Sequence, residues 1–132
     1  MSESKWPQMR KLNSLHPELR PKVERVIGRM YLHGFAPMIY FGYRGLNTQE
    51  KLLSSGNSGV RVSFHNHVVD GKLASLAVDI VDAKQLWGNH EFFVALGEEY
   101  EAVGLIWGGR WSNPDMAHGQ LWINSRLYEV TP

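Results

Sequence analysis

The chain contains no cysteine among its 132 residues. Disulfide scaffolds and thiolate-based catalytic or metal sites are therefore excluded. The chain also lacks an apolar run of the length that a membrane-spanning helix needs, so we expect no stable membrane association. The first seven residues carry charges with no apolar stretch behind them, which is unlike a signal peptide. Any metal site must be built from histidine and carboxylate side chains.

An excess of charge of one sign is also missing. The 14 lysines and arginines are balanced by 13 aspartates and glutamates, for a net charge of +1. Nucleic-acid-binding domains usually show a clustered basic face, so we expect no nucleic-acid partner. With 43% hydrophobic and 20% charged residues, the composition is typical of a globular domain. The length leaves no room for a second folded module, so we predict a single domain over residues 1–132, with its core at about 12–123.

Apolar residues recur at helical spacing in two stretches of the chain. The pattern predicts amphipathic helices over residues 17–33 and 89–103. Gly34 and Gly104 follow these stretches and are suitable helix stops. We expect a third, short helix near residues 47–54.

Four stretches have the composition of β-strands or hairpins. Residues 37–43, 105–107 and 119–123 are predicted strands. Residues 60–81 are predicted to form a β-hairpin, because Asp70-Gly71 is a strong turn signal between two β-rich runs. Two or three helices combined with hairpin-type strands indicate an α+β fold, in which helices pack on a mainly antiparallel sheet.

Three short segments carry residues suited to a catalytic zinc. His65 and His67 lie two apart on one predicted strand face, so either could be a ligand. Asp79 lies within an apolar strand, where an unpartnered carboxylate is costly to bury. Asp115 precedes His118 by three residues, close enough to act on a water beside the same metal. Two imidazoles and one carboxylate are a common ligand set for catalytic zinc. We therefore predict a Zn²⁺ site, with His65 favoured over His67.

The hairpin imposes a geometric condition on this site. A two-residue turn pairs Val69 with Lys72, and then Asp79 lies on the opposite sheet face from His65, because faces alternate with period two. One additional turn residue or a bulge would instead pair His65 with Ala77. Asp79 would then be a diagonal neighbour on the same face. The metal hypothesis therefore requires an irregularity in this hairpin.

Other polar and aromatic residues are weaker candidates. Arg44 follows a predicted strand and could bind a substrate carboxylate or an oxyanion, or form a salt bridge with Glu50. Tryptophans near the last histidine either fill the core or shape a groove: Trp107, Trp111 and Trp122. Three other histidines are expected to have no part in the site: His16, His33 and His90.

Six segments, taken in order, form a specific combination: Leu15-His16-Pro17, Phe41-Gly42-Tyr43-Arg44, Ser63-x-His65-Asn66, Ala77-Val78-Asp79-Ile80, Gly104-Leu105-x-Trp107-Gly108-Gly109-x-Trp111 and Asp115-x-x-His118. The set resembles the bacterial and phage cell-wall peptidases of the D-Ala-D-Ala carboxypeptidase and L-alanyl-D-glutamate endopeptidase family, peptidase family M15. The resemblance is strongest to the small phage endolysins of that family.

This resemblance implies a small α+β domain and a role for each motif residue. His65, Asp79 and His118 would bind zinc, Asp115 would be the catalytic acid and base, and Arg44 would stabilise negative charge. Further residues would contact substrate: Tyr43, Ser63, Trp107 and Trp111. The implied substrate is the peptidoglycan stem peptide, cut between L-Ala and D-Glu. A D,D- or L,D-carboxypeptidase is the alternative enzyme, and a non-catalytic zinc-containing wall-binding domain is the alternative outside enzymes.

The resemblance also implies a cellular setting. We expect a monomer without a separate cell-wall-binding domain. With no signal peptide recognised, it would remain in the host cytoplasm until a separate pore former released it to the cell wall.

Overall fold

The computed structural model describes residues 12–42, 65, 67–69, 72–121 and 129–130, and for 67–69, 72–73 and 129–130 it describes the backbone alone. The predicted short helix near residues 47–54 lies outside this part. The elements follow in the order η2 (Leu12–Ser14), α1 (Arg20–Leu32), β1 (Pro37–Phe41), β2 (His67–Val69), β3 (Lys72–Leu73), β4 (Ala77–Asp82), α3 (His90–Ala102), β5 (Ile106–Trp107), η4 (Gly108–Arg110), β6 (His118–Gln120) and β7 (Glu129–Val130).

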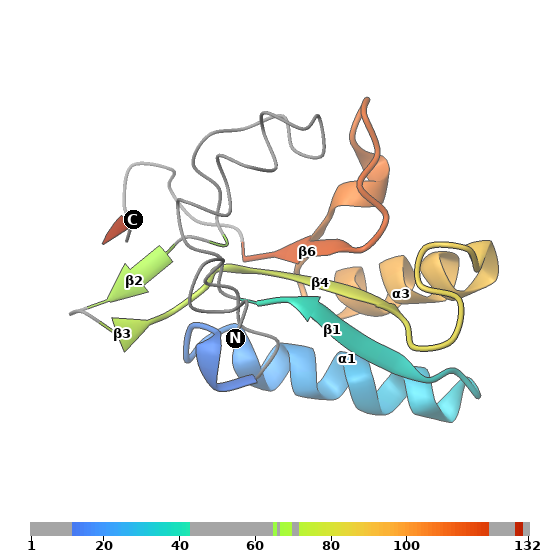
Figure 1. Cartoon of the computed structure of the whole chain (residues 1–132), viewed down its shortest axis with the longest axis horizontal. Helices are drawn as coiled ribbons and strands as arrows, with labels where there is room; N and C mark the ends of the chain where they lie inside the picture. Colours follow the sequence, from blue (N-terminus) through green and yellow to red (C-terminus); the bar gives the residue numbers. More distant parts are fainter. Residues whose placement is uncertain (1–11, 43–64, 66, 70–71, 122–128, 131–132) are drawn as a thin grey trace, which may run out of the picture.

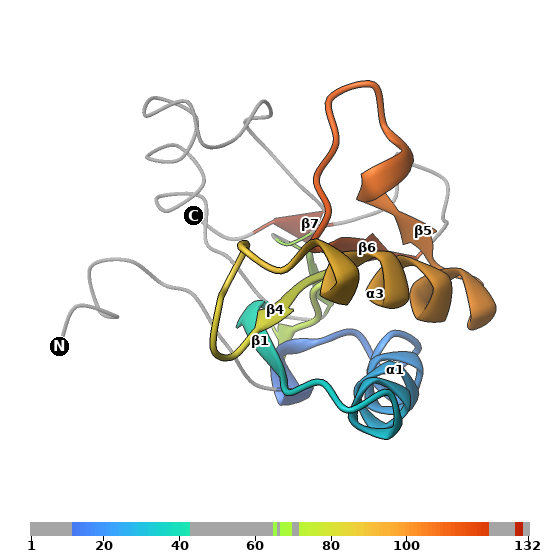
Figure 2. The same ribbon diagram turned by 90° about the vertical axis from the view of Figure 1, so that its right-hand side faces the viewer.

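An antiparallel four-stranded sheet in the order β1-β4-β6-β5 forms the centre of the fold (Figure 1). Helices α1 and α3 pack against each other, and each contacts the sheet (Figure 2). Strand β4 is central, and all six of its residues are buried. A second, three-stranded sheet has the order β3-β2-β7. The predicted α+β fold with a mainly antiparallel sheet is confirmed.

The two helices form where apolar spacing predicted them, with slightly later starts and earlier ends. In α1 the buried residues Val23, Val26 and Met30 recur every three or four positions, which gives the helix one apolar face. Helix α3 begins where the Asn89 side chain accepts a hydrogen bond from the backbone N–H of Phe92, at 3.2 Å. Such a cap satisfies one of the free N–H groups at a helix start.

The two helices and the sheet share one apolar core. Its buried side chains come mainly from α1, β4 and α3: Val23, Val26, Met30, Val78, Ile80, Val81, Phe92, Phe93, Leu96 and Tyr100. In the described residues, no helix is long and apolar enough to cross a membrane.

One polar group links the two helices at the edge of this core. Glu99 of α3 lies 2.9 Å from the Nε2 of His33 and 3.4 Å from the Nε of Arg29 at the end of α1. Burial opposes ionisation of Glu99, but the His33 hydrogen bond and the Arg29 charge outweigh it and lower the pKa of the carboxyl. His33 therefore has a structural role, in an ion pair with Glu99.

The predicted continuous hairpin over residues 60–81 is wrong. The turn itself has the expected register, with Val69 opposite Lys72. After β3, however, the chain leaves that sheet, and β4 pairs with β1 and β6 in the other sheet. His65 is therefore not paired with Ala77, and no bulge beside the turn is needed. The break between the two sheets lets His65 and Asp79 approach each other.

Candidate metal centre

Strand pairing places the candidate ligands together. Asp79 on β4 is directly opposite His118 on β6. On its other side, Asp79 is opposite Phe41, the last residue of β1. The next residue, Gly42, accepts a 2.8 Å hydrogen bond through its carbonyl from the Nδ1 of His65. Three segments distant in sequence thus meet at the middle of β4.

The distances between these side chains suit a shared metal ion. The Nε2 of His65 lies 3.5 Å from one carboxylate oxygen of Asp79, and the Nδ1 of His118 lies 3.4 Å from the other. One ligand atom from each of the three residues lies within 4.8 Å of the others. Ligands bound to zinc at about 2.1 Å in a tetrahedron are separated by about 3.4 Å. The donor set and its spacing therefore fit a zinc ion.

Hydrogen bonds fix which ring nitrogen faces the centre. A carbonyl oxygen only accepts, so the Nδ1 of His65 carries the proton that it donates to Gly42, and its Nε2 faces Asp79. The Oε1 of Gln120 accepts from the Nε2 of His118 at 2.6 Å, and the Nδ1 of His118 faces Asp79. Such outer partners orient metal-binding histidines and set their tautomers. Ser75 Oγ also donates to the Gly42 carbonyl, at 3.1 Å.

The electrostatics of the three buried groups favour a bound cation. Burial alone would raise the pKa of Asp79, but the charges and hydrogen bonds of His65 and His118 hold it well below its ordinary value. Burial alone would lower the pKa of His118, yet the hydrogen bond and charge of Asp79 raise it. The carboxylate is thus ionised and attracts positive charge, which either a proton or a metal ion can supply.

Asp115 lies at the edge of this centre. Its Oδ2 is 3.8 Å from the Nδ1 of His118, and its side chain is 47% exposed, in contrast to the three buried groups. Its backbone N–H donates to the carbonyl of Gly108 at 2.9 Å. A Cβ on Gly108 would lie 2.6 Å from the Asp115 carbonyl oxygen, so this close approach requires glycine. Asp115 is therefore held beside the centre with its carboxylate accessible to water.

Two aromatic donors hold the segment between Asp115 and His118. Tyr100 donates its hydroxyl to the carbonyl of Ala117, and Trp107 donates its Nε1–H to the carbonyl of Met116, both at 2.8 Å. A Cβ on Gly119 would lie 2.7 Å from the Tyr100 ring, so glycine admits this ring against β6. Trp107 therefore packs and positions this segment.

The remaining predicted site residues differ in what can be said of them. Trp111 is 40% exposed, and its ring centroid lies 5.0 Å from that of His118. Three predicted residues lie outside the described part of the chain: Tyr43, Arg44 and Ser63. The side chain of His67 also lies outside it, although its backbone pairs with Val130 in the second sheet.

The groups that orient the two histidines were not among the residues predicted from the sequence. Gln120 is two residues after His118 on one strand, and period-two alternation puts both on the same face. That signal was present in the sequence. The Gly42 carbonyl carried no comparable signal, because any residue supplies a carbonyl.

Comparison with known proteins gives structural likeness without a sequence-family match. No protein-family model and no curated protein sequence matches the chain. Among solved structures, it is similar to the L-Ala D-Glu endopeptidase ChiX of Serratia marcescens, with 24% identity, a TM-score of 0.61, and 84% of this chain and 83% of that one covered. It is also similar to a mutant of the vancomycin resistance D,D-pentapeptidase VanY, from a VanB-type cassette, in complex with Zn(II). There the identity is 16%, the TM-score 0.55, and the coverage 81% and 72%.

These likenesses define the class of fold. The chain has a fold similar to those of an L-Ala D-Glu endopeptidase and a D,D-pentapeptidase, and a buried His-Asp-His group that can hold a metal lies within it. The peptidase resemblance predicted from the ordered motifs is thus confirmed in the fold.

Proposed function

We propose that the protein is a zinc-dependent peptidase that hydrolyses the peptidoglycan stem peptide between L-Ala and D-Glu. The observation that carries the proposal is the buried group of His65, Asp79 and His118, with both histidines oriented by outer hydrogen bonds. Its occurrence on a fold similar to that of an L-Ala D-Glu endopeptidase supports this choice of bond. The Zn(II) complex of the second similar structure supports the choice of metal.

The proposal assigns metal binding, proton transfer and charge stabilisation to different residues of the chain. His65, Asp79 and His118 would hold zinc through Nε2, a carboxylate oxygen and Nδ1. Zinc in such sites acidifies water and polarises a carbonyl. Asp115 would accept the proton of the attacking water and return it to the leaving amine. Arg44 would stabilise negative charge developing on the substrate.

One specific observation supports an alternative enzyme. The likeness to a D,D-pentapeptidase supports a D,D- or L,D-carboxypeptidase. A wall-binding domain with structural zinc would need the ligands but not Asp115. The exposure of Asp115 beside the ligands therefore favours an enzyme. The resemblance to small phage endolysins supports a role in lysis, in which a separate pore former gives access to the wall.

Digestion of purified peptidoglycan tests the proposal. Zinc-loaded protein should release fragments that end in L-Ala or begin with D-Glu, as identified by mass spectrometry. Chelator-treated protein and a zinc-loaded Asp115→Asn variant should release almost none. Fragments that lack only a terminal D-Ala would establish the carboxypeptidase alternative. Zinc binding without any cleavage would support the wall-binding domain.

A further inference from the structure

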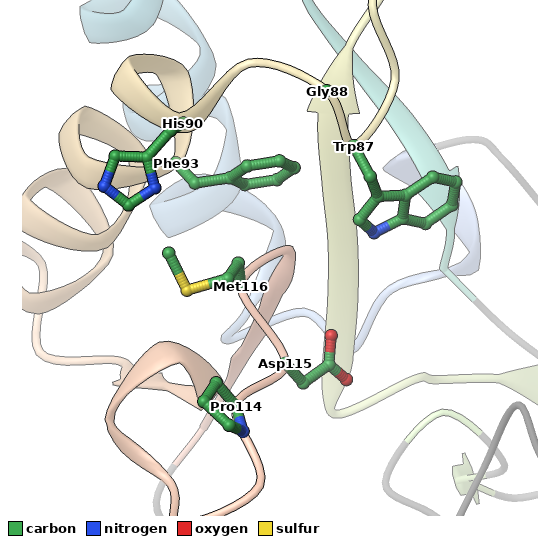
Figure 3. Close-up of a pocket in the computed structure, with 7 residues that line it drawn as sticks. All are labelled: Trp87, Gly88, His90, Phe93, Pro114, Asp115 and Met116. Atoms are coloured by element: carbon green, nitrogen blue, oxygen red, sulfur yellow. The ribbon is translucent and has the colours of Figure 1, made fainter.

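A cavity of about 320 Å³ lies next to the metal centre and is not part of it (Figure 3). Its walls come from the loop before α3, the start of α3 and the segment that leads to β6. The side chains that line it are Trp87, His90, Phe93, Pro114, Asp115 and Met116. Figure 3 shows Trp87 on one side of this space, His90 on the other, and the Asp115 carboxylate between them and Pro114.

Asp115 joins the cavity to the metal centre. Its carboxylate lines the cavity and lies 3.8 Å from the Nδ1 of His118. In the proposed reaction, Asp115 acts on the attacking water and on the leaving amine, so the scissile bond would lie next to its carboxylate. A substrate group attached directly beside that bond can therefore extend into the cavity. The cavity is a candidate specificity pocket for one flank of the substrate.

The walls of the cavity favour a neutral, partly apolar group. Trp87 is 49% exposed, and its ring packs edge-on against Tyr40 with centroids 4.7 Å apart, which holds the indole in place. Phe93 and Met116 add apolar surface, and His90 adds a ring that can form hydrogen bonds. A small apolar pocket with a few polar groups is typical of ligand sites.

The charge of the cavity wall restricts which substrate group can bind in the cavity. Asp115 is the carboxylate among the described lining residues, and it would repel an anionic group. A cationic group would pair with Asp115 and occupy the oxygens that the proposed reaction needs. The leaving residue of an L-Ala–D-Glu bond carries at least one free carboxylate, whereas the alanine side is neutral when its amine is acylated. The alanine side therefore matches the cavity.

We propose that this cavity binds the neutral N-acyl group on the alanine side of the scissile bond, so that the enzyme prefers acylated stem peptides to peptides with a free amine. This inference rests on the proposed function. In peptidoglycan, the acyl group is the one through which the stem peptide is attached to the glycan strand. The enzyme would accordingly act on attached stem peptides before released ones. Trp87 and His90 would be the residues that determine this preference.

Three peptides with the same L-Ala–D-Glu bond test the proposal: one N-acetylated, one with a free amine and one N-succinylated. Their kcat/KM values would be measured with zinc-loaded protein at one fixed pH. The acetylated peptide should be preferred over each of the others by about tenfold, the scale of small-group discrimination in a pocket. Trp87→Ala and His90→Ala should each lower kcat/KM for the acetylated peptide and shrink the preference.

Val94→Ala is the matched control. Val94 is 42% exposed on α3 and does not line the cavity, so this variant should keep the full preference. Thermal unfolding of each variant would show that the fold is retained. Equal cleavage of acetylated and free-amine peptides would overturn the proposal. A preference that persists in both Trp87→Ala and His90→Ala would overturn it as well.

A binding measurement separates this inference from the proposed function. N-acetyl-L-alanine methylamide would be titrated into the zinc-loaded protein, and the indole N–H signal of Trp87 followed by NMR. If no peptide is cleaved, the proposed function fails, yet a shift of this signal would still support the cavity as an acyl-group site. If no shift occurs at millimolar ligand, the cavity assignment fails. Cleavage without a preference for the acetylated peptide would support the proposed function and overturn only the assignment of the cavity as an acyl-group site.

Discussion

The metal centre and the cavity beside it meet at Asp115, yet they are built by different means. Asp79 and His118 are fixed by direct pairing of two central strands, and they are buried. Trp87 and His90 come from a loop and a helix start, and both are exposed. Strand pairing leaves little freedom of position, whereas exposed loop side chains can change with small cost to the fold. The comparison implies that the candidate metal centre is held rigidly and that the proposed substrate preference can vary independently of it.

Removing one of the proposed metal ligands should have the largest effect, because it should abolish zinc binding at the rigid region. Either Asp79→Ala or His118→Ala removes a ligand from a buried set of three, so we expect loss of stoichiometric zinc. Inductively coupled plasma mass spectrometry after gel filtration measures the zinc content. His90→Ala is the control, because His90 lies in the cavity, and this variant should keep one zinc per chain. Full zinc content in Asp79→Ala would contradict the assigned ligand set.

Asp115→Asn changes the residue that the metal centre and the cavity share, and it should lower activity without loss of zinc. The change keeps the volume and removes the proton acceptor, so kcat should fall about a hundredfold or more. Zinc content and thermal stability should remain near those of the unaltered protein, because Asp115 is half-exposed and lies outside the buried ligand group. Turnover near the original rate would remove Asp115 from its proposed role.

Gln120→Ala should lower the zinc affinity of the metal centre without removing a ligand. The hydrogen bond from the Nε2 of His118 to Gln120 would be lost, and the ring would be less well oriented. Outer partners of this kind are generally worth about 10- to 100-fold in metal affinity. Competition with a fluorescent zinc chelator measures the change. Gln120→Glu should retain affinity, because a carboxylate can accept the same bond, and equal losses in both variants would contradict this explanation.

Glu99→Gln should lower the stability of the fold and leave the metal centre unaffected. The folded-state pKa of Glu99 is below the ordinary value of 4.5, so the ionised carboxylate stabilises the folded chain. This contribution is present above pH 4.5 and is lost as the pH falls through the lowered pKa. We expect the variant to be about 1 kcal/mol less stable at pH 7, with a smaller difference toward pH 3. Urea unfolding at several pH values measures this, and zinc affinity should not change. A difference independent of pH would contradict the assigned ionic contribution.

Local sequence signals predicted the elements that depend on local physics. Apolar spacing identified both helices, and the β-rich composition identified β1 and β4. Asp70-Gly71 predicted the register of the turn between β2 and β3. The same signals could not show that β4 joins a different sheet from β3. That exchange depends on pairing with β1 and β6, which are distant in sequence.

The candidate site was predictable where residue chemistry was distinctive. Two histidines and an aspartate in an apolar strand were conspicuous, and the structure brings all three together. The cavity was not predictable, because Trp87 and His90 approach Asp115 only through packing of the loop and α3. His90 was expected to have no part in the site. Its place in the cavity wall gives it a proposed role that sequence position alone did not suggest.

X-ray absorption spectroscopy of the zinc-loaded protein tests the central claim most directly. We predict two imidazole nitrogens and carboxylate or water oxygens at about 2.0–2.2 Å, the distances usual for zinc. His65→Ala should lose stoichiometric zinc, and His67→Ala should keep zinc with an unchanged two-imidazole spectrum. An intact two-imidazole spectrum in His65→Ala, together with loss of one imidazole in His67→Ala, would contradict the assigned metal centre.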